Sequence, residues 1–176
     1  MPTPILIVFS GLPGTGKTTL AKVVAQKTGS VYLRIDSIEQ ALRNAGVLAG
    51  DVGSSGYQVA NDVALGNLQI GSSVVVDCVN PVAESRRAWA LVAAKAAVRL
   101  LDVQVVCSNV VEHRRRVETR EGDVPGLISP SWESVLAHEY EPWPVAPFTL
   151  DTAELSPCAA VAALLEHVAL SAVPPA

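Results

Sequence analysis

Cysteine and histidine are scarce in this 176-residue chain, which has three of each. The cysteines are odd in number and unrelated in spacing: Cys78, Cys107 and Cys158. Such a set predicts neither a disulfide framework nor a metal knuckle. The histidines show no metal-ligand spacing either. A reducing compartment, the cytoplasm, fits this composition best.

Long apolar runs and an excess of basic residues are also missing. No segment approaches the roughly 18 apolar residues that a membrane span requires, and the N-terminus has no basic leader of a secretory signal. We therefore expect a protein without membrane contact.

The 13 Lys and Arg residues are outnumbered by 17 Asp and Glu residues, for a formal net charge of -4. Broad, sequence-independent nucleic-acid binding is not expected, because it needs a basic surface.

Hydrophobic residues are abundant, at 49% of the chain. This content and the length favour one domain, which we place at residues 1–170, with residues 171–176 as a disordered tail. Apolar runs typical of buried strands are Ile5–Phe9, Val31–Ile35, Val74–Val76, Val103–Cys107 and Phe148–Leu150. Helices are predicted at Gly16–Thr28, Ser37–Asn44, Tyr57–Ile70, Val82–Val98, Val110–Glu121, Ser131–Glu141 and Pro157–Leu170. This alternation predicts an α/β fold with a parallel sheet between helices.

A phosphate-binding motif follows the first apolar run. Residues 11–18, within GLPGTGKTT, fit the pattern GxxxxGK[ST]. In such a loop the glycines let backbone N–H groups surround phosphates, the lysine reaches the β- and γ-phosphates, and the hydroxyl binds Mg²⁺. The predicted nucleotide-binding residues here are Gly11, Leu12, Pro13, Gly14, Thr15, Gly16, Lys17, Thr18 and Thr19. The sequence therefore predicts a nucleoside triphosphate with Mg²⁺ bound through Thr18.

Two aspartates follow the second and third strands, at the sheet edge where α/β proteins bind ligands. Asp36 is the first candidate for a general base that takes the proton of an acceptor hydroxyl; the alternative is that Asp36 or Ser37 caps a helix. Asp77 ends an apolar run in the manner of a Walker B element. It is the first candidate for a second metal ligand and the second candidate for the base. A turn-forming role for Asp77 remains the alternative.

Four arginines occur within residues 114–120 of this acidic protein. Arg116 and Arg120 are four apart and would share one helical face, where a bound polyanion would relieve their repulsion. We expect a lid over residues 110–131 whose arginines stabilise charge on a transferred phosphoryl group. The alternative is a solvated helix with Glu112–Arg116 and Arg114–Glu118 ion pairs. We expect a flap at residues 44–56 and a hinge at 123–132 to form the acceptor pocket; the alternative for residues 44–56 is a plain surface loop.

Several motifs together resemble the small P-loop kinases, a group that includes chloramphenicol phosphotransferase, phage-type polynucleotide kinase, zeta toxins, gluconate kinase and adenylylsulfate kinase. The motifs are GLPGTGKTT, YLRIDSIEQAL, GYQVANDVALGNL, VVVDCVNP, RRRVETR and PGLISPSWESVLAHEYEPW. The chain is most similar to bacterial proteins labelled AAA-family ATPases that have the features of kinases.

This resemblance implies a P-loop NTPase three-layer sandwich with five parallel strands in the order 2-3-1-4-5 and a helical lid. It implies that Asp36 matches the base carboxylate, that Arg116 and Arg120 match paired lid arginines, and that the loop at Thr152 borders the adenine. Glu39 stands where polynucleotide kinase has an arginine, which weighs against a nucleic-acid acceptor.

From the residues and the resemblance, we expect an ATP- and Mg²⁺-dependent kinase that phosphorylates a hydroxyl of a small molecule. Lys17, Asp36, Arg116 and Arg120 are the expected catalytic residues, and the protein is expected to be a monomer or homodimer. One alternative is a nucleotide-dependent ATPase or switch that acts on a protein partner. Another is a polynucleotide or nucleotide-sugar kinase, which would share the chemistry and differ in its acceptor.

Overall fold

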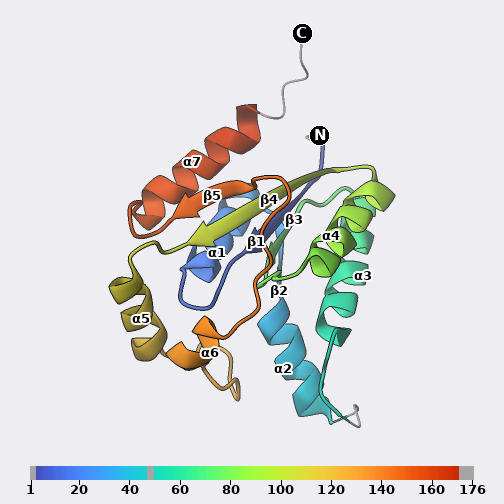
Figure 1. The fold of residues 1–176 in the computed structure, drawn as a ribbon. Helices are drawn as coiled ribbons and strands as arrows, with labels where there is room; N and C mark the ends of the chain where they lie inside the picture. Colours follow the sequence, from blue (N-terminus) through green and yellow to red (C-terminus); the bar gives the residue numbers. More distant parts are fainter. Residues whose placement is uncertain (1–2, 47–49, 171–176) are drawn as a thin grey trace.

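A computed structural model describes residues 3–46 and 50–170 of the chain (Figure 1). Part of the flap predicted at residues 44–56 and the whole of the tail predicted at 171–176 lie outside the described residues. The elements in chain order are β1 (Ile5–Ser10), α1 (Lys17–Thr28), β2 (Val31–Arg34), α2 (Ile35–Ala45), α3 (Ser55–Gln69), β3 (Val74–Asp77), α4 (Ala83–Ala96), β4 (Arg99–Val106), α5 (Val110–Thr119), α6 (Trp132–Leu136), β5 (Phe148–Asp151) and α7 (Pro157–Leu170).

The five strands form one parallel sheet in the order β2-β3-β1-β4-β5. This confirms the predicted fold class and strand order. Strand β1 is central, with Val8 opposite Val76 of β3 and Phe9 opposite Val103 of β4. Because all strands run the same way, their carboxyl ends meet at a single edge. The phosphate-binding motif, Asp36 and the start of α5 all follow strand ends at that edge.

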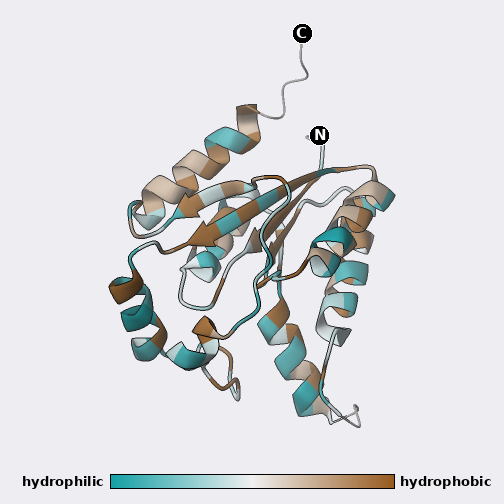
Figure 2. Ribbon diagram, in the orientation of Figure 1, coloured by the Kyte–Doolittle hydropathy of each residue, from teal (hydrophilic) through white to brown (hydrophobic). Residues whose placement is uncertain are grey.

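Two hydrophobic cores lie on opposite faces of the sheet, as Figure 1 shows from the helices on either side. Ile7 and Phe9 of β1 pack against α1 and α7, whereas Leu6 and Val8 pack against α3 and α4. Both faces are therefore apolar, and the central strands are brown in Figure 2. A strand buried on both sides needs a continuous apolar run, which is why the sequence revealed β1.

The boundary between α4 and β4 differs from the prediction. The helix expected to reach Val98 ends at Ala96, and the strand expected to begin at Val103 begins at Arg99. Ala97 lies between them with a left-handed φ of 53° and donates its N–H to the carbonyl oxygens at the helix end. Glycine is the usual residue for such a cap, so alanine gave no signal in the sequence.

The helix predicted at Ser131–Glu141 is wrong in length, because α6 spans Trp132–Leu136 alone. The segment after it is held by the loop that follows β3. The Glu141 N–H donates to the Pro81 carbonyl oxygen at 2.8 Å, and the Glu141 carboxylate accepts from the Ala83 N–H at 2.6 Å. These long-range bonds, with a proline following Glu141, favour an extended path over helix propensity.

Within residues 3–46 and 50–170, none of the helices combines the length and the apolar character that crossing a bilayer would require.

Candidate active site

The loop between β1 and α1 has the backbone of a phosphate cradle. Its glycines 11, 14 and 16 all have positive φ, between 83° and 147°, a region that other residues rarely adopt. A Cβ added at Gly11 would collide with the carbonyl oxygen of Val105, so the loop must pass close to β4. Thr15 Oγ1 donates to the Leu12 carbonyl oxygen at 2.9 Å and closes the loop from within.

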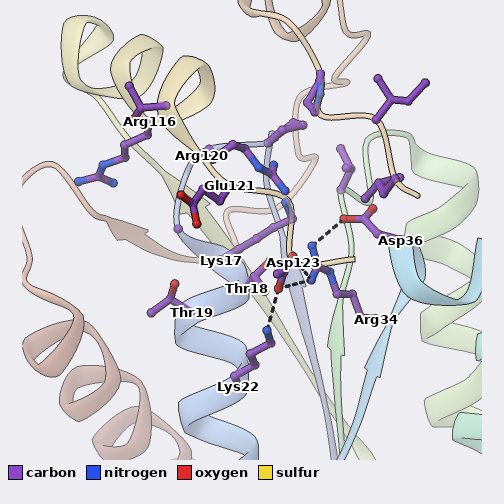
Figure 3. A pocket seen from close by; sticks show the side chains of 18 residues that line it. Lys17, Thr18, Thr19, Lys22, Arg34, Asp36, Arg116, Arg120, Glu121 and Asp123 are labelled. Atoms are coloured by element: carbon purple, nitrogen blue, oxygen red, sulfur yellow. Dashed lines mark hydrogen bonds and ion pairs between the residues drawn. The ribbon is translucent and has the colours of Figure 1, made fainter. Parts of the chain in front are cut away.

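Lys17 opens α1 and is only 7% exposed. It makes no hydrogen bond or ion pair with any part of the chain that the structure describes. Its side chain instead lines a cavity of about 580 Å³ with Thr18 and Thr19 (Figure 3). A buried ammonium group is costly unless an anion accompanies it, and the first N–H groups of a helix favour an anion at this end. The site is therefore built for an anionic ligand.

Asp36 lines the same cavity from the first turn of α2. The alternative, that Asp36 or Ser37 caps this helix, is wrong, since α2 already begins at Ile35 and its cap position is Arg34. The Asp36 side chain is 36% exposed, and its Oδ2 accepts a hydrogen bond from Arg34 Nη2 at 3.2 Å. The carboxylate is therefore held by Arg34 and still open to the cavity.

Asp77 lies outside the residues that line the cavity. Its side chain is 2% exposed, its Oδ2 accepts a hydrogen bond from the Tyr32 hydroxyl at 2.8 Å, and Arg34 Nε is 3.7 Å away. Burial, together with the adjacent Asp77 charge, raises the pKa of Tyr32 well above its usual range, so Tyr32 remains a hydrogen donor. The metal role of Asp77 stays a prediction.

A basic site that we did not predict lies between α1 and β2. Arg34 is almost fully buried and contacts carboxylates of Asp36, Asp77 and Asp123. Asp123, from the loop after α5, also pairs with Lys22 Nζ at 2.9 Å. The sequence contains one indication of this site, namely an arginine within the apolar run VYLRI. It contains no indication of the pairing between Arg34 and Asp123, which are 89 residues apart.

Arg116 and Arg120 both line the cavity, but they lie differently in it (Figure 3). Arg116 Nη1 and Nη2 donate to the hydroxyl and carbonyl oxygens of Thr152, at 2.8 and 3.1 Å, while its Nε pairs with Glu112. Arg120 follows the end of α5 and makes no hydrogen bond or ion pair among the described residues. The Glu112–Arg116 and Arg114–Glu118 pairs named as the alternative are both present.

Thr152 connects the loop after β5 to the phosphate cradle. Its Oγ1 lies 2.7 Å from the Thr15 carbonyl oxygen, and its methyl group is close to the position that a Cβ on Gly16 would take. The predicted adenine-side residue thus lies directly against the cradle, with Arg116 held over it.

His113 was assigned no role from the sequence, yet it joins α5 to the cradle. Its Nε2 is 2.8 Å from the Pro13 carbonyl oxygen, which can only accept, so Nε2 carries the proton. The ring meets Trp132 edge to face at a centroid distance of 5.2 Å. Helix α5 is therefore packed against the phosphate-binding loop. A lone histidine with no spacing pattern gave no sequence signal.

A family model described as an AAA domain, AAA_33, matches residues 6–128, which include the cradle, Asp36 and the lid arginines. The chain belongs to the AAA_33 family. An uncharacterized protein of Mycobacterium tuberculosis is 41% identical to this AAA_33 chain over 63 residues. That match covers 34% of this chain and 13% of the relative, so the chain spans only a small part of the curated relatives it matches.

Solved structures share the AAA_33 chain's fold over nearly its whole length. The APS kinase CysC of Mycobacterium tuberculosis, solved in complex with AMPPNP and APS, has a TM-score of 0.67 and 22% identity, with 98% of this chain and 100% of that one covered. An unliganded sugar kinase from Janibacter sp. has a TM-score of 0.66 and 20% identity, with 99% and 100% covered. The sequence resemblance to small P-loop kinases is thus confirmed for the fold.

Proposed function

We propose that this AAA_33 domain transfers the γ-phosphoryl group of ATP to a hydroxyl group of a small molecule. The observation that carries the proposal is the buried Lys17 in a glycine cradle, which has no partner within residues 3–46 and 50–170, with the Asp36 carboxylate open to the same cavity. Lys17 would hold the terminal phosphates, and the Asp36 carboxylate would receive a proton. The similar folds of an APS kinase and a sugar kinase support phosphoryl transfer.

The residues present fit ATP and Mg²⁺. The positive-φ glycines and Lys17 would hold the triphosphate, and the Thr18 hydroxyl would bind the metal. Among the described residues there is no group of three or more His, Cys, Asp or Glu that could hold a metal ion by itself. A magnesium ion at a kinase site needs only one or two protein ligands, because phosphates and water supply the others.

In this mechanism Asp36 would accept the proton of the acceptor hydroxyl. The oxygen of that hydroxyl would take the γ-phosphoryl group, with ADP as the leaving group. ATP supplies the phosphoryl group. Lys17 would neutralise charge on the transferred group, with Arg120 reaching it from the lid. Arg116, held at Thr152, would act at the nucleotide. A cavity of about 580 Å³ is in the range of small-molecule sites.

The structure offers little for a nucleic-acid acceptor. Glu39, at the position where polynucleotide kinase has an arginine, pairs with Arg43 at 3.5 Å and is not among the residues that line the cavity. A metabolite or other small alcohol is therefore the preferred acceptor.

An acceptor panel assayed for ADP release above the acceptor-free background tests the proposal, with Asp36→Asn and the exposed Asp62→Asn compared in parallel. We expect Asp36→Asn to bind ATP normally and to transfer about 10²–10⁴-fold more slowly, the usual contribution of a general base. Asp62→Asn, on α3 and outside the residues that line the cavity, should behave as wild type. Full turnover by Asp36→Asn with an identified acceptor would remove Asp36 as the base.

A further inference from the structure

The Asp123 carboxylate occupies a small cationic site at the side of the cavity, next to Asp36 (Figure 3). Arg34 Nη1 donates to both Asp123 oxygens, at 2.8 and 2.7 Å, and Lys22 Nζ donates to one at 2.9 Å. The two cations come from β2 and α1, which are fixed parts of the fold. The carboxylate comes from the segment 120–131, which has neither helix nor strand. The two cations are thus held by a strand and a helix, whereas the Asp123 carboxylate is held by a loop.

Exposure separates Arg34 from its two partners. Arg34 is 5% exposed, whereas Asp123 and Lys22 are 43% and 47% exposed. The hydrogen bonds from Arg34 and then Lys22 hold the pKa of Asp123 well below its usual range, so the group is an anion at neutral pH. Replacing Asp123 by another anion would keep a partner for Arg34 Nη1, whereas leaving the position empty would leave the buried guanidinium paired through Nη2 and Nε alone.

The charges around Arg34 and Lys22 favour a ligand with one negative charge at the position of the Asp123 carboxylate. Without Asp123, the positive charges of Arg34 and Lys22 are balanced by the two carboxylates that also contact Arg34, Asp36 and Asp77. A single negative charge would therefore repeat the present balance. A dianion would add a second charge close to both aspartates, and like charges at such range repel.

We propose that Arg34 and Lys22 bind a carboxylate group of the phosphate acceptor, and that Asp123 occupies this subsite until the acceptor displaces it. This inference rests on the proposed phosphotransfer. Because Asp36 and Asp123 contact the same guanidinium group, the reacting hydroxyl and the bound carboxylate are only a few atoms apart. The acceptor class is therefore a short hydroxy acid.

The subsite can be tested without turnover, by filling it with acetate in Asp123→Ala. The protein is first saturated with Mg²⁺ and AMPPNP so that acetate cannot act at the phosphate cradle. At constant ionic strength, we expect acetate to raise the Tm of Asp123→Ala and to leave wild type unchanged, with the neutral analogue acetamide without effect. Adding Lys22→Gln should reduce the acetate response. Equal responses of Asp123→Ala and wild type to acetate would overturn the subsite.

The acceptor class is tested with pairs that differ only in the carboxylate: glycerate against glycerol, and gluconate against glucitol. We expect the acids to be the better substrates. Asp123→Ala should lower KM for glycerate about tenfold, since it removes a tethered competitor whose effective concentration is in the millimolar range, and should leave KM for glycerol unchanged. In the Asp123→Ala background, Lys22→Gln should raise KM for glycerate by a few-fold, as expected for an exposed pair.

The outcomes separate the two proposals. Preference for the neutral alcohols, or an Asp123→Ala variant that is impaired equally with acids and alcohols, would mean that Asp123 only closes the lid, and the inference would be wrong. Absence of phosphoryl transfer to every acceptor, combined with a positive acetate response, would leave the carboxylate subsite standing and count against the proposed function instead.

Discussion

His113 allows a test of whether the lid helix supports the phosphate-binding loop. His113→Ala removes the 2.8 Å hydrogen bond to Pro13 and the edge-to-face contact with Trp132. The hydrogen bond contributes about 1 kcal/mol and the aromatic pair about 0.5–1.5 kcal/mol. With the cavity left by a side chain that is 8% exposed, we expect a loss of about 2–4 kcal/mol in the free energy of unfolding.

His113→Phe separates the two contributions, because it keeps a ring against Trp132 and leaves the Pro13 carbonyl without its donor. Its expected cost is about 1–2 kcal/mol, measured by equilibrium urea unfolding. We also expect weaker binding of a fluorescent ATP analogue, since the loop would lose one of its supports. His138→Phe, at an exposed position, is the matched control. If His113→Phe matched wild type in both assays, the lid would not support the cradle.

Two further changes test other parts of the structure. Burial raises the pKa of Asp102 to about 6, so the folded state keeps a proton that the unfolded state releases, and stability should fall as the pH rises from about 4 to 6. Above pH 6, Asp102→Asn should then have a free energy of unfolding about 1–2 kcal/mol higher than wild type, after allowance for solvent screening. Urea titrations below pH 4 should show no difference between the two proteins. Arg116→Ala should lower kcat/KM by about 10²-fold or more in steady-state assays. The control Arg114→Ala, which removes an exposed ion pair, should change kcat/KM little. Equal effects of the two substitutions would show that Arg116 has no special role.

The parts of the fold that could be predicted from the sequence are those set by local pattern. Continuous apolar runs revealed β1 and β3 because both faces of these strands are buried. The cradle was found because its glycines and Lys17 are close in sequence and fit one motif. Asp36 was found from its place after a strand, and the structure brings it to the cavity with Lys17.

What could not be predicted depends on contacts between distant segments. Ala97 has a left-handed backbone conformation, which an alanine in the sequence does not predict. The path after α6 is set by Glu141 bonding to the loop after β3. Asp123 lies in an unpatterned loop, and only the fold places it against Arg34. Local propensity contains no information about any of these partners.

The fate of the γ-phosphate tests the central claim most directly. Wild-type protein and Lys17→Met are incubated with ATP labelled at the γ-phosphate, Mg²⁺ and the acceptor panel, and the labelled products are separated. We predict that wild type places the label in an organic phosphate ester and that Lys17→Met yields none. Label found only in inorganic phosphate with every acceptor, together with nucleotide-driven assembly in gel filtration, would contradict phosphotransfer and indicate an ATPase switch.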